Sequence, residues 1–207
     1  MMAQPVIHCT AKLGKLLAVR ACELPERIDA WNAHLFPYNG RKCIIFVHAS
    51  TGYCLLMLDV VKAELVDLPA RFSDLLRDQL LGEWQMHSER INTWLKEQTH
   101  AVIAPTNGDK RTLGVINRYI FEVTYVLDRH HPPLSRRAAF LEAWNKNDGL
   151  VGARTESNSI LRQAKYFIPA ERMAAHIGIP YDRQDYSARQ SKALFPDEVP
   201  WRPMRVV

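Results

Sequence analysis

Two apolar runs separated by a short turn constrain this chain more than any other feature of its sequence. The first run spans residues 42–48, Lys-Cys-Ile-Ile-Phe-Val-His, and the second spans residues 53–58, Tyr-Cys-Leu-Leu-Met-Leu. Residues 50–52, Ser-Thr-Gly, turn the chain between them. Such continuous apolarity predicts two neighbouring strands that are buried on both faces, so helices must cover both sides of the sheet.

The neighbouring segments complete an α+β pattern. Residues 31–36 alternate large apolar and polar side chains as a half-buried strand does, and Asn39-Gly40 turns the chain back. Apolar residues recur at helical spacing over 70–84 and 88–95. Residues 111–128 fit a helix or a strand, and their length favours the helix. We therefore expect an α+β domain over residues 5–129, with a mostly antiparallel sheet covered by the helices near 70–98 and 111–128.

A change in composition marks the end of this domain at His130-His131-Pro132-Pro133. Beyond it we expect a basic, mostly helical extension over residues 131–207, which becomes an extended tail after Pro180. The chain carries 27 basic and 22 acidic residues, and the extension holds 12 of the basic ones but only 8 of the acidic ones. A net charge of +5 permits an anionic partner without requiring one.

The overall composition predicts a soluble cytoplasmic protein. Of the 207 residues, 47% are hydrophobic and 24% are charged, and no apolar run approaches the roughly 18–20 residues of a membrane span. The first residues lack the pattern of a secretory signal. Because no apolar run is long enough, we expect no contact with a membrane. The four cysteines form no CxxC pair, so we expect reduced thiols.

Several short blocks resemble a bacterial family catalogued as a domain of unknown function. The blocks are an opening with Cys9-Thr10 and Lys12-Leu13, a strand start at Arg41-Lys42-Cys43, and a late block with Thr106-Asn107, Arg111, Leu113-Gly114 and Asn117. The resemblance covers about residues 6–128, although residues 108–110 make the late loop longer than expected. It implies an α+β fold and no particular activity, and members of the family occur alone or beside mobile-element genes.

The same blocks supply a candidate anion- or partner-binding site: Lys12, Arg41, Lys42, Asn107, Arg111 and Asn117. Asn107-Gly108 can expose backbone N–H groups before a helix, and a helix start beside Arg111 suits an anion. The alternative gives the asparagines structural roles. In that interpretation Asn107 caps the helix and Asn117 holds a loop through backbone hydrogen bonds.

Other chemistry has less support in the sequence. His8, Cys9, Cys43, His48 and Cys54 could lie on neighbouring strands, but they lack the usual zinc-site spacings. We therefore predict no metal and no cofactor, and we interpret Cys9 as a buried thiol rather than a nucleophile. The chain also lacks a GxSxG elbow and a glycine-rich phosphate loop.

The leading functional hypothesis is a non-catalytic binding or regulatory protein, associated with mobile elements, whose partner is another protein or a second copy of the chain. One alternative is nucleic-acid binding through the arginine-rich extension, with Arg154, Arg162, Lys165, Arg172 and Arg183 as candidate contacts. Another alternative is an enzyme with an anion-binding pocket around Lys12, Arg41 and Arg111. The sequence leaves the question of enzymatic activity open.

Overall fold

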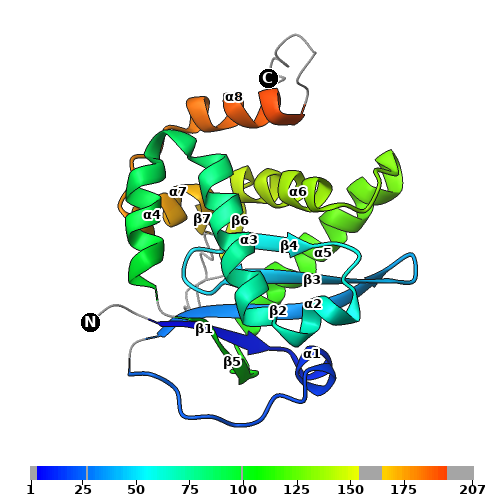
Figure 1. Ribbon diagram of the computed structural model, residues 1–207. Coiled ribbons are helices and arrows are strands. Elements are labelled where there is room, and N and C mark those ends of the chain that lie inside the picture. The colour runs from blue at the N-terminus through cyan, green and yellow to red at the C-terminus, as the bar shows by residue number, and fades with distance from the viewer. Residues whose placement is uncertain (1–3, 27, 99, 154–164, 195–207) are drawn as a thin grey trace, which may run out of the picture.

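A five-stranded sheet of order β4-β3-β2-β1-β5 forms the centre of the protein (Figure 1). The computed structural model describes residues 4–26, 28–98, 100–153 and 165–194. The strands are β1 (Gln4–Cys9), β2 (Ile28–Tyr38), β3 (Arg41–His48), β4 (Cys54–Met57) and β5 (Val102–Pro105). β2, β3 and β4 form the predicted antiparallel meander, and β1 pairs in parallel with both β2 and β5. The α+β class is confirmed, with the meander making up the larger part of the sheet.

Helices cover both faces of the sheet, as the apolar strands predicted. On one face lie α2 (Lys62–Val66), α3 (Leu68–Glu83) and α4 (Ser88–Glu97), with the short 3-10 helix η1 (Gln85–His87) between α3 and α4. Phe72, Leu76 and Leu80 of α3 share a buried cluster with Ile44 and Phe46 of β3. On the other face lies α5 (Lys110–His130), so the helix predicted over 111–128 is confirmed. α6 (Arg136–Asp148) runs along the β4 edge of the sheet, where the Asn147 side chain hydrogen-bonds the backbone N–H and carbonyl oxygen of Cys54 (Figure 1).

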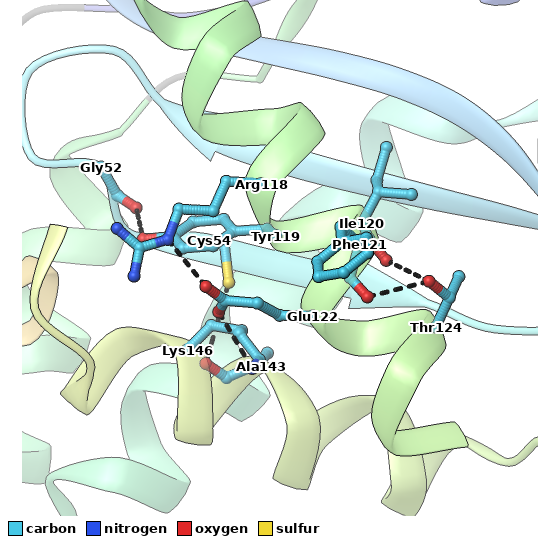
Figure 2. Close-up of polar contacts among 10 residues, drawn as sticks. All are labelled: Gly52, Cys54, Arg118, Tyr119, Ile120, Phe121, Glu122, Thr124, Ala143 and Lys146. Atoms are coloured by element: carbon cyan, nitrogen blue, oxygen red, sulfur yellow. Dashed lines mark hydrogen bonds and ion pairs between the residues drawn. The ribbon is translucent and has the colours of Figure 1, made fainter. Parts of the chain in front are cut away.

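Polar contacts fasten α5 to the sheet and to α6 (Figure 2). The Tyr119 hydroxyl donates to the carbonyl oxygen of Gly52 at 3.1 Å. The Glu122 carboxylate accepts from Arg118 Nε at 2.7 Å and from Lys146 Nζ of α6 at 3.2 Å. Burial alone would raise the pKa of Glu122, but these two cations lower it. Because Lys146 is buried, this ion pair is less screened by water than an exposed pair would be.

The C-terminal part of the chain shares its core with the sheet. The hairpin of β6 (Val151–Ala153) and β7 (Lys165–Phe167) is followed by α7 (Pro169–Ile177) and α8 (Arg183–Leu194). Trp144, Met173 and Tyr186 belong to the same buried cluster as Phe46 of β3. The largely helical C-terminal part is therefore confirmed, and one core crosses the predicted boundary near residue 130.

The extended tail predicted after Pro180 is wrong over residues 183–194, which form α8. The Asp182 carboxylate accepts from the backbone N–H groups of Gln184 and Asp185, at 2.8 Å and 3.2 Å, and so caps the helix. Tyr186 is fully buried and anchors α8 to the core. The burial of this residue holds α8 in place although its sequence lacks an apolar helical stripe.

Within the described ranges, no helix combines the length and the apolarity needed to cross a membrane.

Candidate functional site

One face of the sheet changes from apolar to polar between β3 and β2. Ile45 and Val47 of β3 lie in the apolar cluster that α5 covers. Their partners on β2 are His34 and Asn32. Directly paired residues of antiparallel strands point to the same face, so these polar side chains continue the row that begins with apolar ones.

β1 extends this polar row. His8 pairs with Asn32 in the parallel register, and the backbone N–H of Thr10, directly after β1, donates to the carbonyl oxygen of Ala33 at 3.0 Å. Since side chains alternate along a strand, Thr10 lies beside His34 on the same face. We call His8, Thr10, Asn32 and His34 the polar strip.

Three of the four residues of the polar strip have a buried polar atom without a hydrogen-bond partner in the described structure. These atoms are Thr10 Oγ1, Asn32 Nδ2 and His34 Nδ1. His8 differs, because its Nδ1–H donates to the carbonyl oxygen of Pro105 at 3.0 Å. A buried polar group without a partner costs about 1–3 kcal/mol, so three adjacent ones point to a ligand or to ordered water.

Lys12 adds positive charge beside the polar strip. It lies in the first turn of α1 (Ala11–Leu16) and is exposed. Burial and then the charge of Lys12 lower the pKa of His34, which favours its neutral imidazole. The hydroxyl of Thr10, the amide of Asn32, the imidazole of His34 and the ammonium of Lys12 can all donate hydrogen bonds.

The other predicted cations lie on elements that do not carry the polar strip. Arg41 and Lys42 begin β3, on the hairpin that extends past the end of β1. By strand alternation Arg41 is on the face of the polar strip and Lys42 is on the opposite face. Arg41 Nη1 lies 3.4 Å from Asp59 Oδ1, so Arg41 already has an acidic partner. Arg111 is exposed in the first turn of α5.

The start of α5 is capped from within the chain. The Asp109 carboxylate accepts from the backbone N–H groups of Arg111 and Thr112, at 3.0 Å and 3.1 Å. Asn107 Oδ1 accepts from the backbone N–H of Asp109 at 3.1 Å, so Asp109 and not Asn107 caps the helix. Asp109 thus occupies the place that an anion would take, and Asn117 lies farther along the exposed side of α5.

Two of the five residues predicted to contact nucleic acid, Arg154 and Arg162, lie outside the described residues. Lys165 lies in β7. The Arg172 guanidinium lies 3.6 Å from the centre of the Phe167 ring, and Arg183 Nε lies 3.9 Å from Asp148 Oδ1. Arg172 and Arg183 therefore contact groups of their own chain.

The sequence interpretation missed a polar cluster at the start of β2, on the other face of the sheet. Asp29 at the start of β2 accepts from His48 Nε2 at 2.6 Å and from His176 Nε2 of α7 at 3.3 Å. Burial alone would raise the pKa of Asp29, but the hydrogen bonds from His176 and His48 hold it well below its usual range. His48 stood out as the end of an apolar strand, but nothing in the sequence connects it with Asp29 or His176.

Glu83 of α3 forms a second polar group that the sequence interpretation missed. Its buried carboxylate accepts from Gln79 Nε2 at 2.6 Å, from Asn147 Nδ2 at 3.2 Å and from the Tyr186 hydroxyl at 2.6 Å. Burial outweighs these hydrogen bonds and raises the pKa of Glu83 to about 7. The available signal was that Gln79 and Glu83 fall on the otherwise apolar stripe of their helix.

The cysteines show no activated thiol among the described residues. All four are free, and only Cys22 is exposed. Burial raises the pKa of Cys9 to about 12, which leaves its thiol protonated at pH 7. This agrees with the interpretation of Cys9 as a packing residue.

A cavity of about 200 Å³ lies between the end of β4, α3 and the start of α6. Its charged lining side chains are Asp59, Glu64, Arg71, Asp74 and Arg136. Acidic and basic groups are mixed, and Arg136 pairs with Asp78. The lining of the cavity therefore favours no one class of ligand, whereas the polar strip favours hydrogen-bond acceptors.

The fold and these sites define an α+β domain with helices on both faces of one sheet. The family model of DUF6933, a domain of unknown function, matches residues 6–170, and the chain belongs to this family. The match confirms the resemblance to a domain of unknown function and continues beyond residue 128, through α6 to the start of α7. A comparison with curated proteins finds no match.

Proposed function

We propose that this protein is a binding protein that recognises an anionic group on the polar strip. The observation that carries the proposal is the set of three adjacent buried atoms without partners, Thr10 Oγ1, Asn32 Nδ2 and His34 Nδ1. A bound group would supply the hydrogen bonds that these atoms lack. On this sheet face the four polar residues lie side by side on β2 and at the end of β1, next to the apolar residues of β3, so they are concentrated in one place.

The chemistry of the polar strip favours an acceptor-rich ligand. Asn32 Nδ2 can only donate, and Thr10 and His34 can donate as well. Lys12 adds a positive charge beside His34. Oxygen atoms of a phosphate or carboxylate group would complement these donors, because hydrogen bonds to charged groups are stronger than neutral ones.

A second observation favours a macromolecule as the carrier of this anionic group. Phe121 and Tyr125 of α5 are 72% and 57% exposed, one helical turn apart, and Arg118 and Arg129 flank them. Exposed aromatic residues beside arginine are enriched in protein interfaces.

Nucleic-acid binding, an enzymatic role and a cytoplasmic location stay predictions from the sequence.

The experiment compares two anions and two lysine variants. Inorganic phosphate and a short polyglutamate peptide are titrated into the 15N-labelled protein, and the side-chain amide of Asn32 is followed by NMR. Binding at the polar strip should shift this signal, and Lys12→Gln should weaken binding about tenfold, as expected for the loss of a charge-assisted hydrogen bond. Lys15→Gln, on the same helix and also exposed, is the matched control and should bind normally.

The two titrations also distinguish the possible carriers. Saturable binding of phosphate alone would assign a small-molecule ligand, and tighter binding of the peptide with shifts at Phe121 and Tyr125 would assign an acidic protein partner. An unchanged Asn32 signal with both anions would contradict the proposal. Equal weakening by Lys12→Gln and Lys15→Gln would reduce it to non-specific attraction, and would also contradict it.

A further inference from the structure

Three ligating atoms from separate elements converge beside the start of β2. They are Asp29 Oδ1, His48 Nε2 of β3 and His176 Nε2 of α7, and all lie within 4.8 Å of one another. Asp29 and His48 are buried, whereas the His176 side chain is 32% exposed and gives the cluster contact with solvent. Among the described residues this is the one group of three or more His, Cys, Asp or Glu with such spacing.

We propose that Asp29, His48 and His176 bind a divalent transition-metal ion, with zinc the best match, and that the bound ion fastens α7 to the sheet. Two imidazoles and one carboxylate form a common zinc ligand set, which leaves a fourth position for water. Zinc holds such ligands at about 2.0–2.2 Å, so tetrahedral neighbours lie roughly 3.3–3.5 Å apart. The separation of 3.3 Å between Asp29 and His176 already fits, and the 2.6 Å between Asp29 and His48 must open by less than 1 Å.

Asp29 and His48 each have a further hydrogen-bond partner of the kind that orients metal ligands. Trp31 Nε1 donates to Asp29 Oδ2 at 3.3 Å, which orients the carboxylate and leaves Oδ1 for the ion. His48 Nδ1 lies 2.7 Å from Thr51 Oγ1, so the second ring nitrogen also has a partner. Such partners fix the orientation and the tautomer of metal-binding side chains.

Thr51 can satisfy His48 both with and without a metal. Without metal, Nε2–H of His48 donates to Asp29 and the Thr51 hydroxyl donates to Nδ1. With metal on Nε2, the proton moves to Nδ1, and Thr51 accepts from Nδ1–H as it already accepts from the backbone N–H of Tyr53 at 3.1 Å. The Thr51 hydroxyl proton can then point to Met173 Sδ, 4.0 Å away. Metal binding therefore needs a tautomer change at His48, the same change at His176, whose Nε2 also donates to Asp29 in the metal-free state, and the small opening between Asp29 and His48. The buried His48 keeps a partner for each ring nitrogen.

The cluster connects the family domain with a segment beyond it. Asp29 and His48 lie within residues 6–170, which the family model matches, and His176 lies after its end. α7 is only nine residues long, and its apolar side packs on the core through Met173 and Ile177. A metal bond from His176 would add a strong link at the place where this helix meets the sheet.

The test is a zinc titration of the metal-stripped full chain by isothermal calorimetry. We expect about one equivalent bound per chain, and a cobalt-substituted protein with the absorption spectrum of a four-coordinate site. His176→Gln, at a half-exposed position that leaves the core intact, should weaken zinc binding at least tenfold. The matched control is the double variant His130→Gln and His131→Gln, two exposed histidines at the end of α5, which should bind zinc as the native chain does.

Hydrogen exchange of the α7 amides tests the link to the sheet. Zinc should slow exchange over residues 169–177 in the native chain and not in the His176→Gln variant. The proposal is overturned if the metal-stripped chain binds no zinc, if His176→Gln binds it with native affinity, or if the control loses binding equally. Zinc binding without slower exchange in α7 would overturn the fastening role. Since none of these readouts involves an anionic ligand, they are independent of the proposed function.

Discussion

Replacing the buried carboxyl of Glu83 should remove a pH-dependent loss of stability. Burial raises the pKa of Glu83 from 4.5 to about 7, although three side chains donate to the carboxylate. The folded protein therefore keeps a proton that the unfolded chain releases between about pH 4.5 and 7. The contribution of Glu83 to stability is largest below pH 4.5 and is lost as the pH rises through 7.

The size of this effect follows from the shift in pKa. A rise in pKa from 4.5 to about 7 corresponds to about 3 kcal/mol of stability that is lost at high pH. In Glu83→Gln the amide oxygen can still accept from Gln79 and Asn147, and the amide nitrogen can donate to the hydroxyl oxygen of Tyr186. The variant keeps the network and loses the titration, so it should be more stable than the native chain at pH 8.

The assay is urea unfolding of both proteins at pH 4.5 and at pH 8. Between these values the native chain should lose about 3 kcal/mol more than Glu83→Gln. Histidines and other carboxyls titrate in both proteins, so their contributions cancel in the difference. Glu89→Gln, at an exposed position of α4, is the control and should keep the native pH dependence.

Parallel pH profiles for the native chain and Glu83→Gln would refute the reasoning. If the variant does not fold, carbon NMR of the Glu83 carboxyl in the native chain measures the same quantity directly. A titration midpoint near 4.5 would show that the three hydrogen bonds outweigh burial. That result would also remove the reason to expect a weaker core at high pH.

Two further predictions concern backbone strain and thiol reactivity. Gly52 and Gly40 both have positive φ, but a Cβ on Gly52 would lie 2.9 Å from the Phe167 ring, whereas one on Gly40 meets nothing within 4 Å. Gly40→Ala should cost about 1 kcal/mol from its φ alone and Gly52→Ala clearly more, and equal losses in urea unfolding would contradict the close packing of β7. Cys22 is the exposed thiol, so a thiol reagent should modify one cysteine quickly and the other three only on unfolding. Cys22→Ser should abolish the fast phase, and its persistence would show that a buried thiol is accessible.

The sequence predicted those parts of the fold in which each element carries its own pattern. The apolar runs of β3 and β4 and the apolar stripes of α3 and α5 identify strand or helix locally. The parallel placement of β1 between β2 and β5 has no such local signal, because the alternation of a strand is the same in either direction. α8 was missed because its sequence carries no apolar stripe at helical spacing, whereas in the structure Tyr186 is buried in the core.

Of the polar strip and its surroundings, the sequence pointed only to the charged residue. Lys12 attracted notice as a cation in a short block, and the structure places it beside His34. Asn32 and His34 looked like the solvent-facing side of a half-buried strand, since alternation normally separates a core face from a wet face. In the structure Asn32 is only 3% exposed, and its amide nitrogen is buried without a hydrogen-bond partner. Only the arrangement of neighbouring strands decides which side of β2 faces water.

The two proposed sites should act independently, because β2 carries them on opposite faces, with Asp29 at the start of the strand and Asn32 and His34 near its middle. Asn32 and His34 face α5 near the carboxyl end of β1, whereas Asp29 shares the face of Trp31, which packs with Phe72 of α3. Mutations of side chains in contact can influence each other, but the free-energy changes of mutations at separated sites without shared partners usually add. Lys12→Gln should therefore leave zinc affinity unchanged, and zinc should leave anion binding unchanged. A measured coupling in either direction would mean that β2 itself shifts when one site is filled, and would make the sheet a link between α7 and the polar strip.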